Sequence, residues 1–102
     1  MRRLCALLTL ILTPAAAAHY VPPSTWTALA NCETGGNWQH RNSTYQGGLG
    51  FYYGSWDAYR YRGMPHEAYN ATRRQQIKVA HRIQHDVGWG AWPACSDRLG
   101  LR

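Results

Sequence analysis

The spacing of apolar and polar positions first predicts a short helix over about residues 24–34. Either Ser24 or Thr25, after a proline pair, can cap its start, and Gly35 offers a left-handed stop just beyond its end. At about 100° per residue, one stripe of this helix carries three apolar side chains and one acid, namely Trp26, Leu29, Ala30 and Glu33. The pattern therefore turns a carboxyl group towards the interior.

A longer helix is predicted over about residues 73–87. The sequence Thr72-x-x-Gln75 is a capping box for its start, and Gly88 ends it. Its apolar side is formed by Ile77, Val79, Ala80, Ile83 and Val87. Its solvated side is formed by Arg74, Lys78, His81, Arg82 and His85. The two histidines have the spacing of metal ligands, but the glutamate of a zinc-binding helix is missing, so we predict no metal site.

Two shorter elements are predicted between these helices. Residues 47–53 alternate like a strand or hairpin arm, with a core-facing set formed by Leu49, Phe51 and Tyr53. The other face, nearly bare, would let a ligand approach the backbone and is formed by Gly48, Gly50 and Tyr52. A glycine-rich turn is the alternative. Ser55 can cap a brief helix over residues 56–62 that ends at Gly63, with Asp57 in its first turn.

The N-terminal segment predicts export. Residues 1–3 are basic, residues 4–12 are apolar but too short to anchor in a bilayer, and residues 16–18 fit a cleavage site. We therefore expect a signal peptide over residues 1–18 and a single secreted domain over residues 19–102. No second long apolar run follows, so we expect no stable membrane insertion. The tail after Ser96 is expected to fray.

Charge narrows the choice of partner. The chain carries a formal charge of +6, and cleavage would remove two arginines to leave +4. A moderately basic exported protein suits an anionic partner, such as a cell wall or a membrane surface. The basic residues are scattered and no nucleic-acid-binding motif is present, so we do not predict binding to nucleic acid.

The cysteines favour one disulfide. Cleavage would remove Cys5 and leave Cys32 and Cys95, which in an oxidising compartment pair by default. A bond that closes so long a loop contributes about 4 kcal/mol, which matters for a domain with a small core. Zinc is the weaker alternative, because the chain has no Cys-x-x-Cys sequence.

Glu33 is the candidate catalytic residue. Burial and the negative end of the helix dipole both raise the pKa of a carboxyl group there, as a general acid near neutral pH requires. If Cys32 bonds Cys95, Trp89 and Trp92 lie near this carboxyl group, where indoles increase its desolvation and can stack on sugars. The alternatives are a Glu33 side chain that swings out to solvent and indoles that only complete the core.

Five segments follow one another along residues 24–96: Trp26-x-x-Leu29-Ala30-x-Cys32-Glu33-x-Gly35-Gly36-Asn37-Trp38, Tyr45-x-Gly47-Gly48-Leu49-x-Phe51, Ser55-Trp56-x-Ala58-Tyr59, Ala71-Thr72-Arg73-x-Gln75-Gln76-Ile77-x-Val79-Ala80 and Gly88-Trp89-Gly90-Ala91-Trp92-Pro93-x-Cys95. Each segment alone is a weak signal. In this order, they resemble the transglycosylase-like catalytic domain of the resuscitation-promoting factors of actinobacteria.

This resemblance implies an α+β, mainly helical, compact lysozyme-like fold with a small β-hairpin beside a sugar-binding cleft. It implies a Cys32–Cys95 disulfide and Glu33 as the catalytic acid. The implied substrate is peptidoglycan, whose glycan strands are cut between N-acetylmuramic acid and N-acetylglucosamine. We expect a monomer associated with the cell wall, with no cofactor and no metal.

The resemblance also implies which residues bind substrate. Tyr45 and Ser55 would line the cleft, with Trp56 behind Ser55. We add Trp38 and Trp92 to the substrate-binding set, because indole faces stack on sugar rings.

Gly50 departs from the family pattern, which usually has a glutamine at this position. By strand alternation position 50 faces the cleft, so a hydrogen-bonding amide is missing beside the substrate. Its loss should weaken catalysis rather than folding, by about 1 kcal/mol. A glutamine restored at position 50 should then speed cleavage, unless Gly50 uses a positive φ that glutamine resists.

Sugar cleavage usually needs two carboxyl groups. Glu33 is the one good candidate, since Asp57 and Glu67 each have a simpler structural explanation. The resemblance suggests that the substrate's own N-acetyl group replaces the second, with water or the C6 hydroxyl completing the reaction. Two other hypotheses stay open. They are a wall-binding module without catalysis and a small basic membrane-active protein.

Overall fold

The computed structural model describes residues 20–102, and the expected signal peptide lies outside these residues. The chain forms mostly helices with one two-stranded antiparallel sheet. In order, the elements are α3 (Pro23–Thr34), β1 (Tyr45–Gln46), β2 (Phe51–Tyr52), α4 (Tyr53–Tyr59), η1 (Ala68–Asn70), α5 (Arg73–Val87), η2 (Gly88–Ala91) and α6 (Pro93–Arg98). This composition confirms the expected α+β, mainly helical architecture, which is consistent with a lysozyme-like fold.

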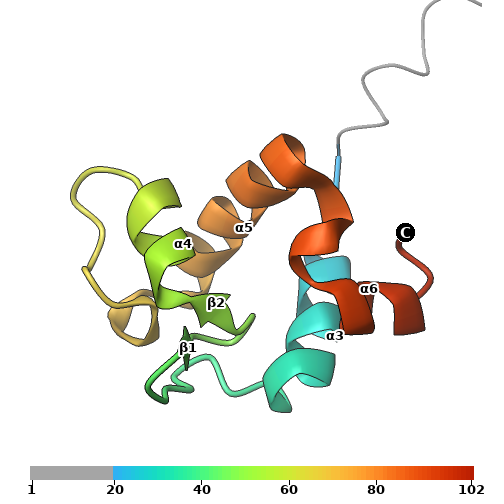
Figure 1. Ribbon diagram of the computed structural model, residues 1–102, viewed down its shortest axis with the longest axis horizontal. Helices are drawn as coiled ribbons and strands as arrows, with labels where there is room; N and C mark the ends of the chain where they lie inside the picture. Colours follow the sequence, from blue (N-terminus) through green and yellow to red (C-terminus); the bar gives the residue numbers. More distant parts are fainter. Residues whose placement is uncertain (1–19) are drawn as a thin grey trace, which may run out of the picture.

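Two groups of elements face each other in Figure 1, with α5 running between them. On one side, α3 and α6 lie side by side, and the expected Cys32–Cys95 disulfide joins them with its Cα atoms 5.9 Å apart. The hairpin and α4 form the other side. In residues 20–102, none of the helices combines the length and apolarity that crossing a membrane requires.

Helix α3 begins at Pro23, one residue earlier than predicted. Pro22 is the N-cap residue and no side chain caps the helix, so the assignment of Ser24 or Thr25 as cap is wrong. A proline at the first helical position needs no N–H partner and already has a helical φ, which explains this start. Gly35 ends the helix in the left-handed conformation as predicted, with φ 70°.

The core is built around the Trp26 indole of α3. Its ring centroid lies 5.3 Å from that of Trp89 and 5.6 Å from that of Trp92. The His81 ring packs against the same indole at 5.2 Å. His81 is therefore half-buried rather than solvated, which corrects the predicted polar side of α5. Val87 is also corrected, because it is 56% exposed.

Helix α5 has the predicted bounds and the predicted capping box. The Thr72 hydroxyl accepts a hydrogen bond from the backbone N–H of Gln75, and the Gln75 side chain accepts one from the backbone N–H of Thr72. Its buried residues are Gln76, Val79, Ala80 and Ile83. A fully buried glutamine was not predicted.

The hairpin is shorter than predicted. Tyr45 pairs with Tyr52 and Gln46 with Phe51, and residues 47–50 form the turn between the strands. Two left-handed glycines, Gly47 at φ 78° and Gly50 at φ 61°, make this tight reversal possible. The glycine-rich turn considered as the alternative is therefore present, between two very short strands.

The predicted alternation holds for two of its core residues only. Leu49 and Phe51 are buried as expected, but Tyr53 is exposed because it already begins α4. Gly48 is also corrected. It is buried, and a Cβ atom there would lie 2.5 Å from the Trp38 ring, so it faces that indole rather than a ligand.

Helix α4 also differs from its prediction. Ser55 lies inside the helix rather than at its cap, and the helix ends at Tyr59 instead of near Gly63. Asp57 is therefore not in the first turn, and its carboxylate pairs with Arg60 at 3.2 Å. The expected fraying after Ser96 is also wrong, because α6 continues to Arg98 and the N–H of Leu101 donates to the Ser96 carbonyl at 2.8 Å.

Candidate active site

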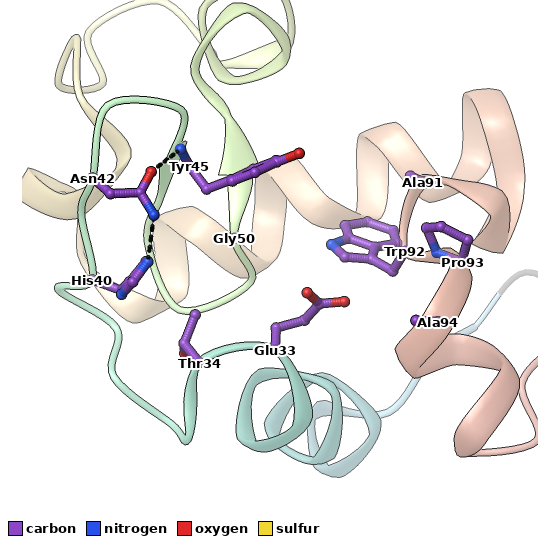
Figure 2. A pocket seen from close by; sticks show the side chains of 10 residues that line it. All are labelled: Glu33, Thr34, His40, Asn42, Tyr45, Gly50, Ala91, Trp92, Pro93 and Ala94. Atoms are coloured by element: carbon purple, nitrogen blue, oxygen red, sulfur yellow. Dashed lines mark hydrogen bonds between the residues drawn. The ribbon is translucent and has the colours of Figure 1, made fainter.

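A cleft of about 410 Å³ opens where the end of α3 meets the hairpin and the start of α6 (Figure 2). Its lining combines one acid with aromatic and polar side chains and open backbone. The lining residues are Glu33, Thr34, His40, Asn42, Tyr45, Gly50, Ala91, Trp92, Pro93 and Ala94. This composition suits a ligand with both apolar faces and hydroxyl edges.

Glu33 enters the cleft from the last turn of α3. In Figure 2 its carboxyl group points into the space between Gly50 and Trp92. Burial raises its pKa above the ordinary carboxyl value, and no neighbouring charge contributes to this shift. The structure thus places a half-buried acid, able to hold a proton above the usual pH range, in the open part of the cleft.

Gly50 and Trp92 set the space around this acid. A Cβ atom on Gly50 would lie 3.6 Å from Glu33 Oε1, so position 50 does face the acid. Opposite, the Trp92 indole is 4% exposed, and its Nε1 donates to the carbonyl of Leu49 at 3.0 Å. The indole is therefore fixed in orientation, with one edge bordering the cleft.

Tyr45 and Ser55 lie on the hairpin side. Tyr45 is 49% exposed and lines both the cleft and an adjoining hollow of about 280 Å³. Ser55 lines only this hollow, which shares Tyr45, Gly50, Ala91 and Trp92 with the cleft. The structure therefore brings Glu33, Tyr45, Gly50 and Trp92 together, with Ser55 one step further along the same surface.

Trp56 and Trp38 do not line the cleft. Trp56 is 0% exposed and its Nε1 donates to the Pro65 carbonyl, so it belongs to the core behind the hollow that Ser55 lines and does not itself contact substrate. The half-buried Trp38 ring packs over Gly48 and beneath the Arg73 guanidinium, 5.2 Å from its centroid. Each indole supports the hairpin from outside the cleft.

The other two candidate acids lie elsewhere. Asp57 and Glu67 border a separate hollow of about 230 Å³ beside Tyr53, and the Glu67 carboxylate accepts a hydrogen bond from the Gln46 side chain. Of the carboxyl groups in residues 20–102, Glu33 alone lines the 410 Å³ cleft. The described chain also contains no cluster of three or more side chains able to hold a metal ion.

Comparison with known proteins shows which family this chain belongs to. The family model described as a transglycosylase-like domain matches residues 21–95, which include the acid, the hairpin and the two cysteines of the disulfide. The chain belongs to the transglycosylase-like domain family. The membership implied by the five sequence segments is thereby confirmed.

The chain is also similar to several curated resuscitation-promoting factors. Resuscitation-promoting factor Rpf1 of Corynebacterium glutamicum is 50% identical over 92 residues, covering 89% of this chain and 47% of the relative. RpfC of Mycobacterium tuberculosis is 43% identical over 88 residues, covering 84% of this chain and 60% of the relative. Rpf of Micrococcus luteus is 41% identical over 87 residues, covering 84% of this chain and 38% of the relative. The chain thus spans about half of the Rpf1 length and less of the Micrococcus protein.

Three cleft residues of this transglycosylase-like domain were not singled out from the sequence. They are Thr34, which was predicted only to end the first helix, and His40 and Asn42, which lie between that helix and the hairpin. The Asn42 side-chain oxygen accepts hydrogen bonds from the backbone N–H groups of Thr44 at 2.8 Å and Tyr45 at 2.7 Å. Asparagine followed by Ser-Thr is a recognisable signal for such a turn, and this turn presents Tyr45 to the cleft.

Two buried glutamines hold the hairpin in place. The Gln76 side chain accepts a hydrogen bond from the Gly48 N–H at 2.8 Å and donates to the carbonyls of Trp38 and Ala71. The Gln46 side chain accepts one from the Ala68 N–H at 2.9 Å. The hairpin and the segments beside it are therefore held together by amide side chains in the interior.

Proposed function

We propose that this domain is a secreted peptidoglycan-cleaving glycosidase, a lytic transglycosylase or lysozyme-like enzyme, with Glu33 as general acid and base. The observation that carries the proposal is the single half-buried carboxyl group with a raised pKa in a cleft bordered by Tyr45 and Trp92. Family membership and the kinship with resuscitation-promoting factors support peptidoglycan as substrate. The bond cut is the β-1,4 link between N-acetylmuramic acid and N-acetylglucosamine.

The chemistry follows from having one acid. Protonated Glu33 donates its proton to the glycosidic oxygen as the bond from this oxygen to the anomeric carbon breaks. Because no second carboxyl group from residues 20–102 lines the cleft, the carbonyl oxygen of the substrate's N-acetyl group forms the new bond to the anomeric carbon. The Glu33 carboxylate then takes a proton from water or from the sugar's C6 hydroxyl, whose oxygen displaces the acetamido oxygen.

The raised pKa serves the first step. A carboxyl group with an ordinary pKa would be almost fully ionised near neutral pH and unable to donate. Burial raises the pKa of Glu33, so a larger fraction of the enzyme is protonated at a given pH. Glu33 lies in the last turn of α3 and shares the cleft with the Trp92 indole.

Export is supported by two independent features. The basic, apolar and small-residue order of residues 1–18 predicts a signal peptide, and the Cys32–Cys95 bond suits an oxidising compartment. We therefore place the mature domain outside the cell, at the wall it cuts.

A non-catalytic wall-binding module is the second candidate, and Gly50 favours it. A Cβ atom at position 50 would lie 3.6 Å from Glu33 Oε1. The amide of the glutamine that the family usually has at this position is therefore absent beside the acid. Such a module would use the same cleft to hold glycan without cutting it.

Mass spectrometry of purified peptidoglycan incubated with the protein tests the proposal. Fragments ending in 1,6-anhydro-N-acetylmuramic acid indicate transglycosylation, and reducing N-acetylmuramic acid ends indicate hydrolysis. Reducing N-acetylglucosamine ends would show that the other glycosidic bond is cut. Wall that sediments with the protein but releases no fragments would contradict the enzyme and support the binding module.

A further inference from the structure

Exposed aromatic side chains gather along the hairpin. In residues 20–102, the exposed large apolar side chains are Tyr20, Tyr45, Tyr52, Tyr53, Val87 and Leu99. Four of these six line the cleft or one of the two hollows near it, namely Tyr45, Tyr52, Tyr53 and Val87. Exposed apolar surface gathered in one place indicates a binding site, whereas scattered exposure does not.

Three tyrosines form a continuous row. Tyr45 and Tyr52 are directly opposite each other in the antiparallel pair, so their side chains stand on the same face of the hairpin. The ring centroids of Tyr52 and Tyr53 lie 4.7 Å apart. Tyr45 borders the cleft, Tyr52 the adjoining hollow, and Tyr53 the hollow beyond, so the row leads away from Glu33.

Gly54 helps to hold the middle ring. A Cβ atom on Gly54 would lie 2.7 Å from the Tyr52 ring, so only glycine lets this ring lie over the first turn of α4. With Tyr53 packed beside it, Tyr52 is supported on two sides while 47% of it remains exposed. An exposed ring held in one orientation loses little entropy when a flat ligand stacks on it.

The far end of the row offers polar groups. The hollow beside Tyr53 is also lined by Asp57, His66 and Glu67. The side chains of Asp57 and His66 are 64% and 82% exposed, and can exchange hydrogen bonds with a ligand. Aromatic faces next to carboxylate and imidazole groups suit a sugar, which has an apolar ring face and hydroxyl edges.

We propose that Tyr52 and Tyr53 form a glycan-binding platform that extends the cleft over the hairpin and the start of α4. The platform rests on the proposed function, and its occupant is the same glycan strand beyond the sugars that flank the cut bond. A strand is linear, so one that crosses Glu33 continues out of the cleft, and the hairpin face is continuous with the cleft through Tyr45 and Gly50.

The test measures how affinity depends on glycan length. Glu33→Gln protein is immobilised, and peptide-free tetrasaccharides and octasaccharides of alternating N-acetylglucosamine and N-acetylmuramic acid flow over it. The octasaccharide should bind more tightly than the tetrasaccharide. The added changes Tyr52→Ala and Tyr53→Ala should each lower octasaccharide affinity roughly fivefold and reduce this preference for length.

Tyr20→Ala is the matched control. Tyr20 is 67% exposed and lines neither the cleft nor the two hollows, and it precedes α3, whereas Glu33 lies in the last turn of that helix. Its removal should leave the length preference unchanged. Gly54→Ala, which keeps every ring but displaces Tyr52, should reduce the preference as Tyr52→Ala does. Circular dichroism and melting curves confirm that each variant is folded.

Several results would overturn the platform. Affinity losses that are equal for both oligosaccharides would place the two rings in the cleft itself. No loss, or a length preference seen only with strands that carry stem peptides, would show that glycan does not occupy the row. Binding is read from fresh ligand, so it is measured even if Glu33→Gln still cuts glycan. Such residual cutting would refute the role of Glu33, not the platform.

Discussion

The two walls of the cleft are held by different chemistry. On one side, a disulfide joins α3 to α6, and the acid lies in the residue after Cys32. On the other, the hairpin is held by the buried side-chain amides of Gln46 and Gln76, which bond to loop backbone. The first wall fixes the acid covalently, whereas the second depends on hydrogen bonds that a single substitution can remove.

The walls meet at the turn formed by residues 47–50. The Thr34 hydroxyl, at the end of α3, donates to the Gly48 carbonyl at 2.8 Å. The Trp92 indole, at the start of α6, donates to the Leu49 carbonyl at 3.0 Å. The position of the turn relative to Glu33 therefore depends on both walls, and each can be weakened separately.

Breaking the disulfide that joins α3 to α6 should have the largest effect on stability. The Cys32–Cys95 bond closes a loop with a sequence separation of 63, and its reduction should cost about 4 kcal/mol of folding free energy. Melting curves with and without reductant measure this loss. Thiol titration of the denatured, unreduced mature domain, which lacks Cys5, should find no free thiol, and two reactive thiols would contradict the account.

Removing the buried amide that holds the hairpin should lower the free energy of unfolding slightly less. Gln76→Ala leaves the Gly48 N–H and the Trp38 carbonyl without their partner and opens space in the core, at about 3 kcal/mol. Denaturant unfolding of the variant measures this change. Gln84→Ala on the same helix, only half-buried, should cost less than about 1 kcal/mol. Equal effects of the two substitutions would show that the buried amide does not hold the hairpin.

A substitution at Gly50 in the turn should lower the free energy of unfolding by less again. Gly50→Gln and Gly50→Ala both force a side chain to adopt φ 61°, so each should lower the free energy of unfolding by about 1 kcal/mol. Only glutamine restores an amide beside Glu33, so it should cut glycan several-fold faster than the alanine variant. Identical rates for the two variants would mean that position 50 does not act on the substrate.

The acid itself should reduce stability slightly, in a pH-dependent way. Burial raises the pKa of folded Glu33, so folding favours the protonated carboxyl group. The contribution of Glu33 to the free energy of unfolding is therefore most favourable below the ordinary carboxyl pKa. It becomes less favourable as pH rises from there through the raised pKa. Glu33→Gln should raise the melting temperature at neutral pH, with a smaller gain in acid. A gain that does not vary with pH would refute this.

Local signals in the sequence identified much of the first wall. The helix period placed Glu33 on the stripe of Trp26 and Leu29, and Gly35 ended the helix. The two cysteines that the expected cleavage would leave allowed one pairing. The capping box likewise set the start of α5. The helix features depend on residues close together in the sequence, and two cysteines can pair in only one way. These features can therefore be predicted from the sequence alone.

The second wall was harder to predict because long-range contacts shape it. Gln76 is buried through bonds to residues 28 and 38 positions away, which no period reveals. Residues 47–50 form the turn and Tyr53 already starts α4, so only Phe51 and Tyr52 remain in the second strand. His81 looked solvated by helical spacing, yet the Trp26 ring covers it.

The most direct test of the central claim is the rate at which Glu33→Gln releases fragments from purified peptidoglycan, compared with Asp57→Asn. Both changes replace a carboxyl group by an amide, but only the first lies in the cleft. The account predicts a loss of at least about a hundredfold for Glu33→Gln, near wild-type cleavage for Asp57→Asn, and a wild-type rate that falls as pH rises above the raised pKa. Folded Glu33→Gln protein that still cleaves at a similar rate would contradict it.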